Sequence, residues 1–182
     1  MLICLIGCTC SGKSTILNEL HQLGVEKIVT YTTRPPRSKD EFYYFLSDDE
    51  FNTLNNMGYF ATISQFEIDT DTVWQYGVAK ANVFDDEKDR SLIINPQEVD
   101  YYRNLDNCIV VYLYANNEII WNRLRTRGSG ADDARRRIES DTEAFKGILD
   151  KVDFAIKNDG YTPSEEIARY IKAILDTKGE KG

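Results

Sequence analysis

The sequence predicts an α/β fold with a central, mainly parallel sheet flanked by helices. Residues 1–6 form a continuous apolar run and residues 109–115 (IVVYLYA) form a second, both typical of strands buried on both faces. Between such runs lie stretches with helical spacing. The first covers residues 13–23, with apolar side chains at Ile16, Leu17, Leu20 and Leu23. Strands that alternate with helices imply parallel pairing through crossover connections.

The remaining elements follow the same alternation along the chain. We expect strands at residues 27–33, 91–95 and 154–157, and helices at residues 116–127, 134–149 and from Pro163 onwards. Gly128 is a stop signal for the helix before it, and Pro96 marks the start of a helix after residues 91–95. The last helix opens with the capping-box pattern of residues 162–165 (TPSE).

Residues 31–81 break this alternation, because they are rich in Tyr, Phe and Thr and contain Pro35 and Pro36. They predict a small β-rich lobe with one short helix at residues 48–55. No linker separates independent domains, so we expect a single domain. Its core would comprise residues 1–30, 82–126 and 134–182, with the lobe at 31–81 and a short lid at 127–133.

The composition argues against several classes of function. The net charge is -8 and the pI is about 4.8, whereas sequence-independent binding of nucleic acid needs a basic surface. No apolar stretch approaches the roughly 20 residues of a membrane span, and residues 1–6 lack the basic leader of a secretory signal. The four cysteines and the single histidine match no zinc site or disulfide framework. We therefore expect reduced thiols in a cytoplasmic protein, as a monomer or homodimer.

Residues 7–14 read GCTCSGKS, which is the phosphate-loop pattern G-x-x-x-x-G-K-S, followed by Thr15. Two glycines allow backbone angles that turn successive N–H groups inward around an anion, and the helix that follows adds its positive end. Lys13 would reach the β and γ phosphates of ATP, and the Ser14 hydroxyl would ligate Mg²⁺. We expect the nucleotide to be bound by Gly7, Cys8, Thr9, Cys10, Ser11, Gly12, Lys13, Ser14 and Thr15.

Residues 32–37 (TTRPPR) follow the second predicted strand and carry Arg34 and Arg37. Two arginines three residues apart, braced by two prolines, would make a stiff bidentate clamp for a phosphate group. A solvated basic turn would have the same sequence, so the pattern alone leaves both interpretations open.

Residues 123–137 hold six arginines around the segment 127–130 (RGSG), which is the composition expected of a closing lid. Phosphoryl transfer depends mostly on positioning and on neutralising charge, and one well-placed arginine contributes about 10³–10⁵ in rate. We assign Arg127 and Arg137 to this role. Arg125, Arg135 and Arg136 instead suggest a charged helix face paired with Asp132, Asp133 and Glu139.

The order of these motifs resembles the guanylate kinase family along nearly the whole chain. After TTRPPR come residues 43–51 with Tyr43, Phe45, Ser47 and Phe51, then Phe60, Gln65-Phe66 and Tyr76-Gly77. Residues 123–128 resemble the family's R-L-x-x-R-G, residues 137–138 its later R-L, and residues 153–159 its D-Y-x-I-x-N-D.

The resemblance implies a P-loop kinase that transfers the γ-phosphoryl group of ATP to GMP. It implies that Arg34, Arg37, Tyr43 and Tyr76 bind the acceptor's phosphate group, and that Arg123, Arg127 and Arg137 approach the transferring group together with Lys13. Asn158 would lie near the adenine. ATP and Mg²⁺ are then the cofactors, and a nucleoside monophosphate is the partner molecule.

The positions that would bind the acceptor base depart from the family pattern. The family's serine after the second strand falls on Thr30, its glutamate in F-I-E falls on Thr62, and its serine after Y-Y-G falls on Val78. The family's D-x-D falls on Ile93 and Asn95. Guanine presents N–H donors that a carboxylate accepts well, so these changes put the acceptor base in question. Residues 67–75 could supply a carboxylate, although a solvated acidic loop has the same composition.

Three functions therefore stay open at this point. The leading one is phosphoryl transfer from ATP to GMP. The second keeps ATP and changes the acceptor to another (deoxy)nucleoside monophosphate or to a phosphorylated sugar. The third is a non-catalytic guanylate kinase-like binding module, which typically has a degraded phosphate loop, whereas this chain retains Lys13 and Ser14.

Overall fold

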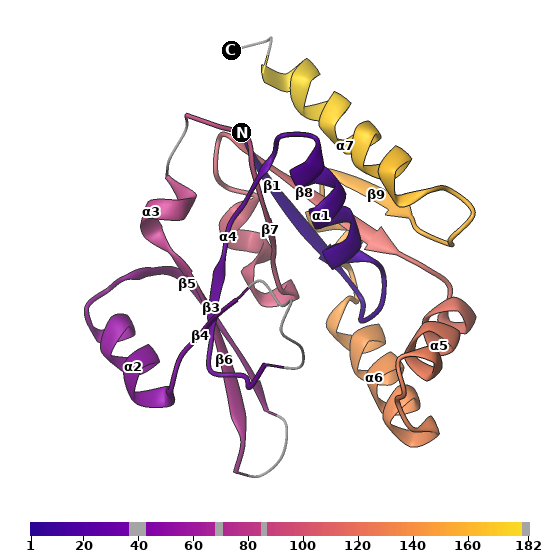
Figure 1. Cartoon of the computed structure of the whole chain (residues 1–182), viewed down its shortest axis with the longest axis horizontal. Helices are drawn as coiled ribbons and strands as arrows, with labels where there is room; N and C mark the ends of the chain where they lie inside the picture. Colours follow the sequence, from indigo (N-terminus) through magenta and orange to yellow (C-terminus); the bar gives the residue numbers. More distant parts are fainter. Residues whose placement is uncertain (37–42, 68–70, 85–86, 180–182) are drawn as a thin grey trace. The chain divides into compact units, whose positions relative to one another are not determined.

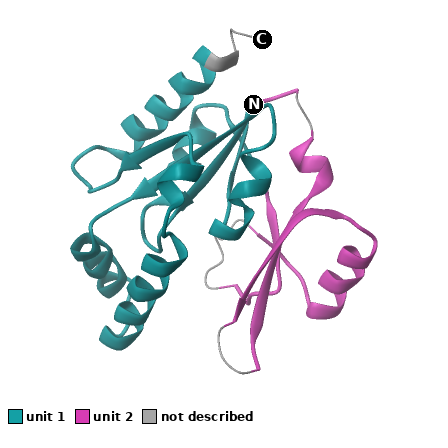
Figure 2. Cartoon of the chain, turned by 180° about the vertical axis from the view of Figure 1, so that it is seen from behind, with its two compact units in different colours: residues 1–27, 89–182 teal, residues 28–88 magenta. Residues whose placement is uncertain are grey.

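The computed structural model of the chain describes residues 1–36, 43–67, 71–84 and 87–179 (Figure 1). The chain divides into two compact units (Figure 2). The first, here called the core unit, joins Met1–Lys27 to Asp89–Gly182, and the second, the small unit, is Ile28–Lys88. Along the described parts of the chain, no helix has the length and apolar character required to cross a bilayer.

The core unit contains a five-stranded sheet in the order β2-β7-β1-β8-β9, with every pair parallel. The strands are β1 (Leu2–Gly7), β2 (Glu26–Lys27), β7 (Arg90–Ile93), β8 (Cys108–Tyr114) and β9 (Phe154–Lys157). Parallel neighbours require crossover connections, and helices form those that follow β1, β7 and β8, whereas the small unit connects β2 to β7. The prediction of a central parallel sheet flanked by helices is therefore confirmed.

The helices of the core unit follow the strands in turn. They are α1 (Lys13–Gln22), the 3₁₀ turn η1 (Pro96–Glu98), α4 (Val99–Tyr102), α5 (Asn117–Thr126), α6 (Ala131–Ala144), η2 (Ile148–Lys151) and α7 (Ser164–Gly179). On one face of the sheet, α1 and α7 bury Ile16, Leu20 and Ile171 against Ile3 and Leu5 of β1. Successive β1 residues point to opposite faces and every one is buried, which explains the unbroken apolar run.

The small unit is a second sheet in the order β4-β3-β6-β5. Its elements are β3 (Thr30–Thr32), β4 (Tyr43–Phe45), α2 (Asp48–Asn56), β5 (Phe60–Glu67), β6 (Val73–Ala79) and α3 (Lys80–Val83). Ser47 and Glu50 form a capping box at the start of α2. The fully buried ring of Phe51 stacks on Phe60 of β5 with centroids 4.7 Å apart.

Two expected elements have different boundaries. The strand expected at residues 27–33 is divided: β2 ends at Lys27 and pairs with β7, whereas β3 begins at Thr30 and pairs with β4 and β6. The helix expected at residues 134–149 is also different: α6 begins at Ala131 and ends at Ala144, and the separate 3₁₀ turn η2 follows after Gly147, which has φ 74°. Asp132 and Asp133 therefore lie in the first turn of α6. Acidic side chains there interact favourably with the positive end of the helix.

Candidate functional site

The phosphate loop connects β1 to α1 at the carboxyl edge of the parallel sheet, where ligands bind in open α/β sheets. Two of its residues adopt left-handed backbone angles, Cys10 with φ 59° and Gly12 with φ 99°. Cys10 is the one non-glycine residue with a positive φ in the described chain. Such a conformation carries a cost for a residue with a Cβ, so contacts around the loop must hold it.

The inner side of this loop presents unused donors. The backbone N–H groups of Cys10, Gly12, Lys13 and Ser14 donate to no residue within the described ranges. The donors in the first turn of α1 have no partner within the helix, because that turn has no preceding carbonyls. A run of unpaired N–H groups at a helix N-terminus is an anion-binding nest suited to phosphate oxygens.

Three side chains from other elements of the core unit hold the backbone of the same loop. The Asp141 carboxylate accepts the Thr9 N–H at 2.6 Å, Arg123 donates to the Cys10 carbonyl at 3.1 Å, and Asn158 Nδ2 donates to the Ser11 carbonyl at 2.8 Å. They come from α6, α5 and the end of β9, respectively. The peptide groups on both sides of the strained Cys10 are thereby fixed from outside.

Lys13 lies folded against its own loop. Its ammonium group donates to the Gly7 carbonyl at 2.7 Å and to the Cys8 carbonyl at 2.9 Å. An ammonium has three donors, so one stays available for a phosphate oxygen. Burial lowers the pKa of Lys13, and the nearby Asp141 carboxylate opposes that shift.

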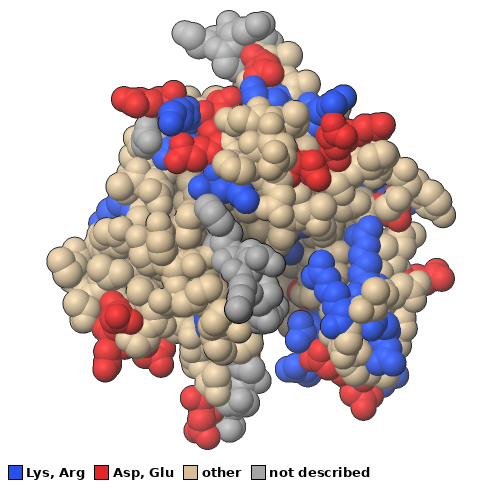
Figure 3. Space-filling view, viewed as in Figure 1, with Lys and Arg blue, Asp and Glu red and all other residues tan. Residues whose placement is uncertain are grey.

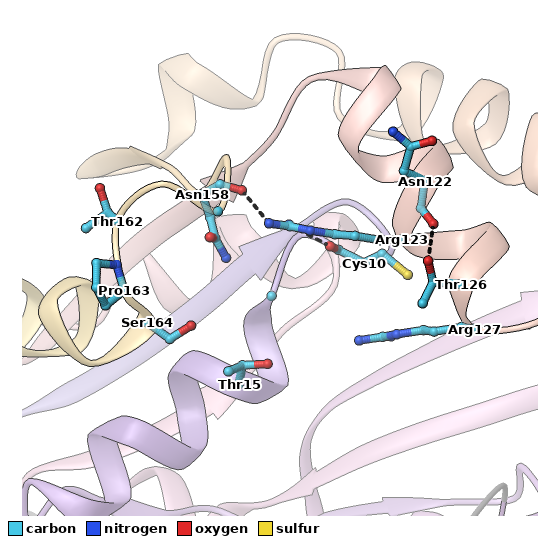
Figure 4. Close-up of a pocket in the computed structure, with 12 residues that line it drawn as sticks. Cys10, Thr15, Asn122, Arg123, Thr126, Arg127, Asn158, Thr162, Pro163 and Ser164 are labelled. Atoms are coloured by element: carbon cyan, nitrogen blue, oxygen red, sulfur yellow. Dashed lines mark hydrogen bonds between the residues drawn. The ribbon is translucent and has the colours of Figure 1, made fainter.

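A pocket of about 520 Å³ opens beside the loop (Figure 4), within the size range of small-molecule sites. Its walls come from the loop with α1, from α5 and from the β9–α7 connection. They comprise Cys10, Gly12, Thr15, Asn122, Arg123, Thr126, Arg127, Asn158, Gly160, Thr162, Pro163 and Ser164. Figure 4 shows Arg123 between Cys10 and Asn158, with Arg127 extending along the same wall. The predicted adenine neighbour Asn158 and the phosphate loop thus line one cavity.

The three arginines predicted to approach the transferring group have different surroundings. Arg123 donates to the carbonyls of Cys10 and Asn158, at 3.1 and 3.0 Å, so it braces the loop. Arg137 lies 2.9 Å from the Asp133 carboxylate. The Arg127 side chain makes no hydrogen bond or ion pair with any described residue, and its positive charge contributes to lowering the pKa of Lys13. Arginine and lysine side chains gather over α5 and α6 in Figure 3.

The expected surface pairs on α6 are present in part. Arg135 lies 3.4 Å from Asp132, and Arg136 lies 2.9 Å from Asp133. Arg125 donates instead to the Ser129 carbonyl at 2.7 Å. The arginine neighbours hold the pKa of Asp133 below its usual value, through Arg136 first and Arg137 second.

Within the small unit, three predicted acceptor residues lie together. The buried Arg34 guanidinium lies 5.4 Å from the centre of the Tyr43 ring, and that ring meets Tyr76 edge-on at 6.2 Å. Thr30 pairs with Tyr43 across β3 and β4, and Thr62 pairs with Val78 across β5 and β6. The remaining member of the predicted set, Arg37, lies outside the described residues.

The donor set is compatible with magnesium held chiefly by nucleotide. The Ser14 side chain is exposed at the start of α1 and bonds to no other described residue. Mg²⁺ usually keeps several waters and combines few protein ligands with substrate phosphates. Among the residues that the structure describes, no three His, Cys, Asp or Glu side chains gather into a metal site.

Asp141 is the site residue that the sequence analysis missed. It belongs to the inward stripe of α6, formed at helical spacing by Ala134, Ile138, Asp141 and Phe145, while the intervening side chains are mostly exposed. Asp141 is the charged member of this otherwise apolar stripe. A carboxylate at an apolar position of an amphipathic pattern was the available signal.

Comparison with known proteins gives a consistent family. Residues 3–146 match the family described as an AAA domain. A guanylate kinase of Nostoc sp. is 29% identical over 171 residues, covering 88% of this chain and 83% of the relative. A guanylate kinase of Trichormus variabilis is 28% identical with the same coverage.

Two solved structures share the fold. A guanylate kinase from Anaplasma phagocytophilum has a TM-score of 0.71 and 22% identity, covering 98% of this chain and 85% of its own. The YorR protein of Bacillus subtilis, solved in complex with phosphorylated GDP, has a TM-score of 0.53 and 18% identity, covering 99% of this chain and 98% of its own. At these identities the structural likeness concerns the fold alone.

Proposed function

Because this chain belongs to the AAA domain family and is guanylate kinase-like, we propose that it transfers the γ-phosphoryl group of ATP to GMP. It is a nucleoside monophosphate kinase, and its curated relatives are guanylate kinases. The observation that carries the proposal is the intact phosphate loop. Four of its N–H groups donate to no residue in the described part of the chain, and the Lys13 ammonium donates to two loop carbonyls, which leaves its third donor for a phosphate oxygen.

ATP would bind with its phosphates on the loop formed by residues 7–15 and its adenine in the adjoining pocket beside Asn158. Ser14 would hold Mg²⁺, which would neutralise charge on the β and γ phosphates. The small unit would bind the acceptor. The acceptor's phosphate would be bound by Arg34, Arg37, Tyr43 and Tyr76, and its base would be bound by Thr30 and Thr62. Segment 127–133 would act as the lid.

In the reaction, an oxygen of the acceptor's phosphate attacks the γ-phosphorus, and the bond from that phosphorus to the β,γ-bridging oxygen breaks. ADP leaves, and the monophosphate becomes a diphosphate. Lys13, Arg127 and Arg137 would neutralise the charge on the equatorial oxygens. Arg123 would contribute by keeping the loop in shape, because two of its nitrogens donate to backbone carbonyls.

A second candidate acceptor is another nucleoside monophosphate or a phosphorylated sugar. The observation in its favour is the pairing of Thr62 with Val78 on β5 and β6, at positions where the resemblance places guanine-binding residues. A hydroxyl and an isopropyl group offer no charged acceptor for the two guanine donors, and a lost charged hydrogen bond costs about 1.5–3 kcal/mol. A non-catalytic binding module is disfavoured because the loop retains Lys13 and Ser14.

A coupled assay of ADP release tests the proposal. Purified protein is supplied with Mg·ATP and, in turn, GMP, dGMP, AMP, CMP, UMP, dTMP and a sugar phosphate. GMP-dependent turnover above the others supports the proposal, and turnover with another acceptor only would support the second candidate. Absence of turnover together with absence of ATP binding would refute the kinase assignment.

A further inference from the structure

Helix α6 contacts the phosphate loop through a continuous stripe of side chains. Ala134 and Ile138 pack with Cys10 of the loop in one apolar cluster. Further along, the Phe145 ring stacks on Tyr112 of β8, with centroids 5.5 Å apart and planes 21° from parallel. Asp141 lies between these two anchors on the same face of the helix.

The Asp141 carboxylate is aimed at the loop backbone. It accepts the Thr9 N–H at 2.6 Å, a bond between groups 132 residues apart in sequence. An ionised acceptor makes a hydrogen bond roughly twice as strong as a neutral one, and helix α6 is fixed on either side of it. The helix therefore determines where the Thr9 peptide lies.

That peptide precedes the most strained residue of the loop. Cys10 holds φ 59°, and its own carbonyl is fixed by Arg123. With Thr9 fixed by Asp141, the chain is held on both sides of the unfavourable angle. Thr9 does not line the pocket beside the loop, whereas Cys10 and Gly12 do. The Thr9 N–H already donates to Asp141, so we expect the phosphates to bind the other N–H groups of the loop.

We propose that Asp141 is a positioning residue for ATP, holding the phosphate loop through the Thr9 N–H in the shape that lets the other N–H groups of the loop bind a triphosphate. A loop ordered before binding loses less conformational entropy when the ligand arrives, so affinity rises without any contact to the ligand. Asp141 has this role only if the loop binds ATP, as proposed above. The experiment therefore measures ATP binding by the unmodified chain first.

The test compares three variants of the full chain. Asp141→Ala removes both the acceptor and the charge. Asp141→Asn keeps an oxygen that can accept the Thr9 N–H but is neutral. Glu139→Gln is the matched control, because Glu139 is an exposed carboxylate on the same helix, two residues away. Equilibrium dissociation constants for Mg·ATP are measured by calorimetry below the melting transition of every variant.

We expect Asp141→Ala to raise the ATP dissociation constant about tenfold, which corresponds to about 1.4 kcal/mol. Asp141→Asn should raise it about threefold, because a neutral hydrogen bond replaces a charged one. Glu139→Gln should match the unmodified chain. The KM for the acceptor should stay unchanged in all three. A partly unfolded variant would instead lower the binding stoichiometry in the titration and leave the ATP dissociation constant of the folded fraction unchanged.

Two results would overturn the proposal. Equal ATP affinity in both Asp141 variants and in Glu139→Gln would show that the contact is incidental. Tighter ATP binding by Asp141→Ala would show that the carboxylate competes with phosphate. If Asp141→Ala fails to fold, Asp141→Asn decides alone. Failure of the unmodified chain to bind ATP would refute the proposed function instead.

Discussion

The side-chain amide of Asn158 occupies the space beside Gly12 that a Cβ would need. Asn158 Nδ2 would clash with a Cβ on Gly12, and the same nitrogen donates to the Ser11 carbonyl at 2.8 Å. Position 12 thus requires glycine for two reasons: there is no space for a Cβ, and the backbone adopts a left-handed φ of 99°. The β9–α7 connection and the phosphate loop interlock at this point.

Gly12→Ala should therefore weaken ATP binding by at least about tenfold, because Asn158 must move and the strained angle costs about 1–2 kcal/mol. The matched control is Gly24→Ala, because Gly24 also has a positive φ of 86° but no atom lies within 4 Å of an added Cβ there. It should lower the melting temperature through strain alone and bind ATP normally. ATP titrations of both variants measure the effect, and a normal ATP affinity of Gly12→Ala would contradict the prediction.

Lys13→Ala should reduce phosphoryl transfer by at least about 10²-fold while the protein stays folded. In the proposed reaction the lysine stabilises charge that develops on the phosphates, and in the structure its ammonium group donates to two loop carbonyls. The rate of ADP release and the far-UV circular dichroism are measured together. Lys27→Ala is the control, since this lysine bonds to Asn18 at an exposed position. Near-normal activity in a folded Lys13→Ala protein would refute the assignment of the loop.

The Cys8 thiol should be a poor nucleophile at neutral pH. Burial raises its pKa, and a hydrogen-bonding contact to Tyr112 opposes only part of that shift. A raised pKa leaves less thiolate at any given pH, so alkylation should continue to accelerate above pH 9. Iodoacetamide labelling between pH 7 and 10, followed by peptide mass spectrometry, checks this. Labelling at pH 7 as fast as in urea would contradict it.

The sequence alone predicted the parts of the site that depend on local patterns. The spacing of Gly7, Gly12 and Lys13, between an apolar run and an amphipathic helix, located the phosphate loop. The strand at residues 154–157 was predicted with the bounds that β9 has. These features depend on the period of the side chains and on glycine, both of which are visible in the sequence.

Features set by distant contacts were harder to predict. The run at residues 27–33 has uniform β propensity, and nothing in it shows that Lys27 and Thr30 join different sheets. Arg123 matched a motif for phosphate contact, and its two bonds to backbone carbonyls of distant segments were not predicted by that motif. Asp141 contacts Thr9 across 132 positions, a relation that no local pattern encodes.

The acceptor base gives the last prediction. The resemblance aligns Thr62 with a glutamate, and in the structure Thr62 lies opposite Val78 in the β5–β6 pair. A carboxylate at this position would accept the N–H donors of guanine, a gain of about 1.5–3 kcal/mol. Thr62→Glu should therefore lower the KM for GMP by about tenfold and leave the KM for AMP unchanged or higher, because adenine presents an acceptor at its N1 position. The control is Thr53→Glu, which adds the same charge at an exposed position of α2. Initial rates with both monophosphates measure the effect, and an equal change for GMP and AMP would exclude Thr62 from the base site.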